Sequence, residues 1–193
     1  MDEPRSAPPV FDPTGFFDFD LTSGAVRARG GTRVLMLSDT VVAPLVSSAV
    51  ASGDLTALRR LGRHIGEEIR GSVGGSAVAR GPETVIAHAA GVLALFGWGQ
   101  LVLERWGDAL VARVTSLPDI DESQLALAAL LGGLFTALVQ KDVACVPLMR
   151  EGGGDRNAFI LVDPSVAETV WGWAQAGHDI PTIVQQLAPG DPS

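Results

Sequence analysis

The single cysteine of the chain is the first side chain that could do chemistry. A thiol nucleophile would need Cys145 beside one of the three histidines, His64, His88 and His178. The histidines fall on three different expected elements, and Cys145 lies in an apolar stretch without a cluster of cations around it. A cysteine in such a setting packs as a small hydrophobic side chain. The sequence therefore predicts no catalytic residue and no enzyme activity.

Metal ligation would need several His, Cys or carboxylate ligands at workable spacing. The chain contains no CxxC, HxxxH or HExxH pattern. His64 lies one helical turn from Glu67 and Glu68 and could share a metal with them, but a solvated charged helix face accounts for the same residues. We therefore expect neither a metal nor a cofactor.

Two further patterns have ordinary structural explanations. The acids Asp119, Asp121 and Glu122 are placed to open a helix, where negative charge suits the helix dipole. The glycine runs at 71–75 and 152–154 lack the GxxxxGK[ST] pattern of a phosphate loop. They are expected to form a loop and a hairpin turn.

Charge and hydropathy exclude several classes of partner. The 193 residues carry a formal net charge of −8, and Lys141 is the only lysine, so nucleic acids and anionic membranes are not expected partners. The longest apolar stretch, 125–139, is interrupted by glycines and is shorter than the roughly 20 residues of a membrane span. No signal-peptide pattern opens the chain, and one cysteine suits a reducing compartment. We expect a soluble, cytoplasmic protein.

Apolar periodicity and turn residues divide the chain into elements. Residues 1–14 and 189–193 are expected to be disordered tails, and three extended pieces at 16–21, 25–29 and 33–37 form a small N-terminal β element. The remaining expected elements are helices at 38–51, 54–71, 82–96, 119–140, 164–175 and 180–187, and hairpins at 100–115 and 143–162. Pro44 should kink the first helix or delay its start.

This order predicts the α+β class. The two hairpins form an antiparallel sheet, and a layer of about four helices packs against it. Short C-terminal helices over 163–188 are added to a domain spanning 15–162. The absence of βαβ units argues against a doubly wound nucleotide-binding fold.

Tryptophans and helical glycines mark surfaces that another group approaches. Trp171 and Trp173 are two residues apart on one expected helix and cannot face the same side, so at least one should meet solvent or a partner, unless both fold against their own chain. Gly132 and Gly133 are costly in an apolar helix, roughly 1 kcal/mol each against alanine. A close approach of another element, within one subunit or across a dimer, would offset that cost.

Four segments, taken in order, resemble a known family. They are Leu61-Gly62-Arg63-His64-Ile65-Gly66, Gly97-Trp98-Gly99, Leu131-Gly132-Gly133 and Asn157-Ala158-Phe159-Ile160-Leu161-Val162. Over residues 33–162 the chain resembles the small-molecule-binding domain named after the bacteriochlorophyll 4-vinyl reductase accessory protein. The eukaryotic TRAPP vesicle-tethering subunits share that fold. Many prokaryotic members carry cysteines at the last hairpin, suited to metal, but none stands at 149–151 or 157–159 here.

The resemblance implies a homodimer or heterodimer built on helical faces, and an apolar pocket between helices and sheet. Candidate pocket residues are Phe96, Trp98, Leu131, Phe135 and Cys145. Core packing is the alternative for Trp98, which follows the third helix. Candidate interface residues are Gly132, Gly133, Trp171 and Trp173.

The sequence is compatible with two functions. The first is a non-enzymatic dimeric adaptor that binds a protein partner such as a small GTPase. The missing cysteines and the added C-terminal helices favour it. The alternative is a sensor or carrier that holds a lipid, a porphyrin-like ring or an aromatic molecule in the pocket.

Overall fold

The structure is a computed structural model that describes residues 11–29, 31–73, 81–148 and 156–187. The predicted tail segments 1–10 and 189–193 lie outside the described residues, as do the glycines at 74–75 and the hairpin turn at 152–154. Residues 149–151, which correspond to a cysteine-bearing part of the family's last hairpin, are outside them too.

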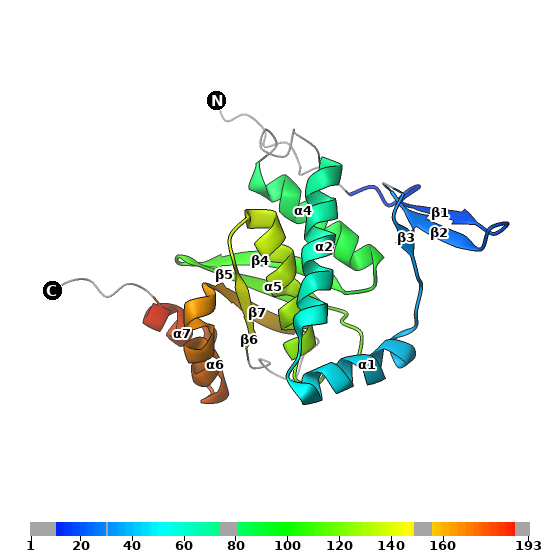
Figure 1. The fold of residues 1–193 in the computed structure, drawn as a ribbon. Helices are drawn as coiled ribbons and strands as arrows, with labels where there is room; N and C mark the ends of the chain where they lie inside the picture. Colours follow the sequence, from blue (N-terminus) through cyan, green and yellow to red (C-terminus); the bar gives the residue numbers. More distant parts are fainter. Residues whose placement is uncertain (1–10, 30, 74–80, 149–155, 188–193) are drawn as a thin grey trace, which may run out of the picture.

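A four-stranded antiparallel sheet forms the centre of the fold (Figure 1). Its strands are β4 (Gln100–Trp106), β5 (Ala109–Thr115), β6 (Ala144–Pro147) and β7 (Arg156–Val162), in the order β4-β5-β7-β6. The registers place Val111, Ile160 and Val146 side by side, and the next row pairs Ala112 with Phe159. Both rows are apolar and buried because both faces of the sheet are covered.

Three helices cover the inner face, which carries Ala112 and Phe159. The helix α5 (Leu125–Val139) packs on β6, α4 (Pro82–Leu95) packs on β4, and α2 (Thr56–Val73) packs on α5 and α4. Glycines allow the close approach of α2 to α5: a Cβ on Gly62 would overlap the carbonyl of Leu130, and one on Gly133 would overlap the carbonyl of Arg59. The α2–α5 contact is therefore backbone against backbone.

The C-terminal elements cover the outer face of the sheet. The short helix η2 (Pro164–Val166), α6 (Ala167–Gln175) and α7 (Ile180–Leu187) follow β7 (Figure 1). Val170 and Ile183 are fully buried against the row that contains Val111 and Ile160. The added helices thus build a second hydrophobic core.

The N-terminal residues form a separate small sheet, followed by an extended segment and a helix. The strands β1 (Phe17–Asp20), β2 (Ala25–Ala28) and β3 (Arg33–Val34) pair in that order, and α1 (Asp39–Ser52) follows. Figure 1 shows this sheet beside α4, joined to α1 by an extended segment. The sheet and the segment form one wall of the pocket described below.

The α+β class and the antiparallel sheet of two hairpins are confirmed. The helix α1 begins at Asp39, close to the expected start, and contains Pro44, so the start is not delayed. Other boundaries differ from the prediction. The extended piece expected over 33–37 forms a strand only over Arg33–Val34. The helix α2 continues through Gly71 to Val73. The helix α5 begins at Leu125, because the Asp121 carboxylate lies before the helix and accepts a hydrogen bond from the N–H of Ala126, at 2.8 Å.

Candidate ligand-binding site

A partly enclosed pocket of about 410 Å³ lies among the N-terminal sheet, α1, α2 and α4. Its volume falls within the roughly 300–1,000 Å³ typical of small-molecule sites. Most of the described residues that line it are apolar: Phe16, Ala28, Val34, Leu35, Leu37, Val42, Leu58, Leu61, Ile65, Ile69, Val92, Phe96 and Trp98. The polar ones are Arg29, Thr32, Arg33, His64, Glu68 and His88.

Helical periodicity places the pocket side chains of α2 in one row. Leu58, Leu61, Ile65 and Ile69 recur every three or four residues and so share a face of the helix. The adjoining face of α2, which carries Gly62 and Gly66, packs on α5. From Leu58 to Ile69 the row spans about 16 Å, because an α-helix rises about 1.5 Å per residue. The pocket is therefore elongated along α2.

The second helical wall comes from α4 and the turn after it. His88, Val92 and Phe96 follow one another at four-residue intervals, and Trp98 comes next along the chain. Trp98 shares a small hydrophobic cluster with Leu58 of α2. The end of α4 and the start of α2 thus meet at one end of the pocket.

Three of the polar lining residues, Thr32, His64 and Glu68, interact with one another. The hydroxyl of Thr32 donates to Oε1 of Glu68 at 2.6 Å, and Nε2 of His64 lies 3.7 Å from the same oxygen. Thr32 belongs to the N-terminal sheet region and Glu68 to α2, so this hydrogen bond links the two walls. It fixes the small sheet against the helix.

His88 lines the same pocket in a half-buried setting. Its ring packs edge-on against Phe11, with the ring centroids 5.1 Å apart. Burial lowers the pKa of His88 below 6.5, and the nearby positive charge of Arg29 lowers it further. The imidazole is therefore neutral at pH 7 and presents a neutral, hydrogen-bonding ring to the pocket.

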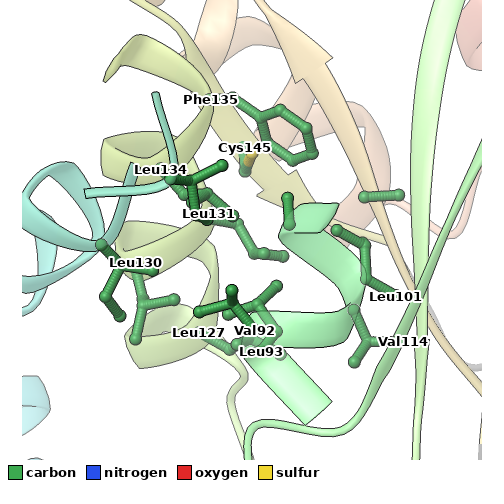
Figure 2. Packing of buried hydrophobic residues seen from close by; sticks show 14 of the residues in the cluster. Val92, Leu93, Leu101, Val114, Leu127, Leu130, Leu131, Leu134, Phe135 and Cys145 are labelled. Carbon is green, nitrogen blue, oxygen red and sulfur yellow. The ribbon is translucent and has the colours of Figure 1, made fainter. Parts of the chain in front are cut away.

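The structure separates the five candidate pocket residues into two groups. Phe96 and Trp98 line the pocket. Leu131, Phe135 and Cys145 lie instead in the core between α5 and the sheet, as Figure 2 shows. Burial raises the pKa of the Cys145 thiol far above its usual range, so the thiolate does not form near neutral pH.

The four candidate interface residues are all in contact with their own chain. Gly133 lies against the backbone of α2 at Arg59, and Gly132 lies against the Arg59 side chain and the backbone of Val143 and Cys145, so the close approach that each permits is within the chain. Trp171 and Trp173 are both half-buried and pack against the core on the outer face of the sheet. Neither indole is turned fully to solvent.

Sequence reasoning missed most of the pocket wall. The apolar period of α2 was visible, but it predicted only a buried face and not a cavity. Phe16, Ala28 and Leu37 come from the N-terminal β element, which the sequence did not place against the helices. The Phe-Asp alternation at 16–21 was the one signal of a half-exposed sheet.

The rest of the described chain offers neither a metal site nor a membrane span carried by one helix. No group of three or more His, Cys, Asp and Glu side chains could hold a metal ion there. No single helix in the described part of the chain is both long and apolar enough to cross a membrane, and only α1 with α2, bent by 119°, passes on length and composition. A second hollow of about 320 Å³ is polar and lies where Arg63 and Arg70 meet the end of α5.

No protein-family model and no curated protein matches the chain. Among solved structures, the fold is similar to the phenol-responsive sensory domain of the transcription activator PoxR, determined with phenol. The TM-score is 0.59 at 12% sequence identity, and the match covers 84% of this chain and 90% of that one. This similarity shows a shared fold. The neighbour is a small-molecule-binding domain and not a tethering subunit, so the family named from the sequence remains a prediction.

Proposed function

We propose that this chain is a non-enzymatic sensory or carrier domain that binds a small apolar ligand in the pocket between α2, α4 and the N-terminal sheet. The observation that carries the proposal is the pocket itself, elongated, mostly apolar and equipped with a few polar groups. The phenol-binding neighbour of the same fold supports it. The pocket therefore favours the ligand-binding alternative over the adaptor.

A neutral fluorescent probe tests this function. N-phenylnaphthylamine becomes bright in apolar surroundings and is small enough for the pocket. We expect saturable binding to the wild-type chain. Leu61 is 40% exposed and lines the pocket, so Leu61→Trp fills the pocket without a clash in the core and should weaken binding about tenfold or more.

The matched control is Leu110→Trp. Leu110 is 39% exposed, lies on β5 and does not line the pocket, so its replacement should leave binding unchanged. Equal binding by wild type and Leu61→Trp would show that the dye sits elsewhere and would contradict the proposal.

An exposed apolar surface supports a second candidate, self-association. Met36, Val41 and Leu45 are 58%, 54% and 66% exposed and lie on the extended segment and α1. Grouped apolar side chains of this kind mark protein-protein contacts. We propose that a second copy covers them, forming a homodimer. Light scattering should then give a dimeric mass for wild type and a monomeric mass for Leu45→Glu, whereas a monomeric wild type would refute it.

A further inference from the structure

We infer that the ligand of the pocket is an amphipathic anion, with an extended apolar body along α2 and an acidic group at the end where Arg29 lies. This inference rests on the proposed ligand-binding function and adds the chemical class of the ligand. The uneven distribution of polar groups in the pocket and the pairing of its charged side chains support it.

The pocket is polarised along its length. Leu58, Val42 and Trp98 lie at one end, where all three pack against the buried apolar cluster of Val46, Ile120 and Ala126. Glu68 lies ten residues further along α2 than Leu58, about 15 Å away, and His88 lies ten residues before Trp98. An extended molecule that fills the pocket therefore places one end against tryptophan and leucine and the other among polar side chains.

The negative charge at the polar end already has partners. Glu68 accepts the hydroxyl of Thr32 at 2.6 Å and lies 3.7 Å from Nε2 of His64. Of the described acidic residues, Glu68 is the one that lines the pocket. Its carboxylate joins two walls of the pocket, and among the described residues it forms no ion pair with Arg29 or Arg33.

Arg29 is a cation with capacity to bind an anion. Its guanidinium donates to the carbonyl of Thr14 at 3.0 Å and lies 5.9 Å from the centroid of the Phe16 ring, which lines the pocket. Among the described residues it forms no ion pair within 4 Å, and Asp12, which feels its charge, bonds to the backbone of Thr14 instead. A guanidinium has five N–H donors, so most of them remain for a ligand.

A second arginine adds positive charge to the pocket lining. Arg33 also lines the pocket, and its guanidinium donates to the carbonyl of Gly24 at 3.3 Å. Among the described residues it forms no ion pair within 4 Å. The described lining therefore carries Arg29 and Arg33 against the one carboxylate of Glu68, and this excess of positive charge favours an anion.

Two dyes that differ in one charged group test the inference. Anilinonaphthalene sulfonate is N-phenylnaphthylamine with an added sulfonate. We expect the wild-type chain to bind the sulfonate about tenfold more tightly than the neutral dye. Arg29→Gln should remove this preference by weakening the sulfonate alone, and Arg29→Lys should keep part of it. Arg105→Gln, an exposed arginine on the β4 strand outside the pocket, is the matched control and should change neither dye.

The outcomes separate the two proposals. Suppose that the neutral dye binds the wild-type chain and that Leu61→Trp weakens this binding. If the sulfonate then binds no more tightly than the neutral dye, or if the Arg29→Gln variant still prefers the sulfonate, the dye binds in the pocket but the anion inference is wrong. If neither dye binds, or Leu61→Trp affects neither, the proposed function fails. Salt provides a test that needs no variant. Raising the salt concentration from about 50 to about 500 mM should weaken binding of the sulfonate and leave binding of the neutral dye unchanged. An unchanged ratio of the two affinities would overturn the inference.

Discussion

Gly62 of α2 lies directly against the backbone carbonyl of Leu130 in α5, where a methyl group would overlap the carbonyl oxygen. Gly66 repeats the contact one turn later, where a Cβ would lie 2.7 Å from the carbonyl oxygen of Leu134. These two contacts hold α2 at a fixed distance and rotation on α5. They thereby turn Leu61 and Ile65 toward the pocket.

The first prediction concerns this contact. Gly62→Ala should lower the free energy of unfolding by about 1–3 kcal/mol, because the backbone of α5 cannot move aside as a flexible side chain would. The measurement is denaturant unfolding followed by circular dichroism. The matched control is Gly71→Ala in the same helix, where a Cβ meets nothing within 4 Å. That change should stabilise the chain by roughly 0.5–1 kcal/mol. Equal effects at both positions would contradict the close approach.

The fold was largely readable from local patterns. The hairpin over residues 100–115 has two apolar-polar strands around Gly107-Asp108, and the structure places β4 and β5 there. The α5 segment is apolar on all sides, as expected for a helix buried between a sheet and another helix. The start of α5 was not predictable, since Gln124 before it adopts a left-handed conformation that its residue type does not suggest.

The candidate site was readable only in part. Trp98 and Phe96 were found because a tryptophan after an apolar helix stands out in a sequence. Leu131 and Phe135 belong to the core, because an all-apolar helix gives no indication of which face meets a cavity. The placement of Phe16 and Leu37 opposite α2 depends on long-range packing, which periodicity does not encode.

Thr136 should be worth more to stability than the ion pair beside it. Its hydroxyl bonds to the N–H of Val143 at 3.0 Å and accepts from Arg59 at 3.2 Å, and the side chain is buried. Thr136→Val preserves the shape but leaves buried donors without this partner, so we expect a loss of about 1–3 kcal/mol in unfolding free energy. Asp142 pairs with Arg63 at 3.5 Å but is 70% exposed. Asp142→Ala should therefore cost less than about 1 kcal/mol, and a larger loss than for Thr136→Val would reverse this ranking.

Cys145 should be chemically silent in the folded chain. It is buried beside Phe135 in the α5–sheet core (Figure 2), and burial raises the pKa of its thiol, so little thiolate is present to react. We expect a thiol reagent such as dithionitrobenzoate to react with the unfolded chain and release one equivalent of chromophore. Over the same time, reaction with the native chain should release less than one equivalent. Fast reaction of the native chain at neutral pH would show that the core opens readily.

The pH dependence of stability should carry a contribution from His88. Burial and Arg29 lower its pKa below the 6.5 of the unfolded chain, so the unfolded state binds the proton more readily. The contribution is complete above pH 6.5 and is lost as the pH falls through the lowered value. The melting temperature should therefore drop between about pH 7.5 and pH 5, and His88→Gln, which cannot be protonated, should flatten that drop. Asp54 and Asp163, whose pKa values hydrogen bonds lower from 3.8, act in a more acidic range. A melting temperature with the same slope in wild type and His88→Gln would show that His88 is not held neutral against the pocket.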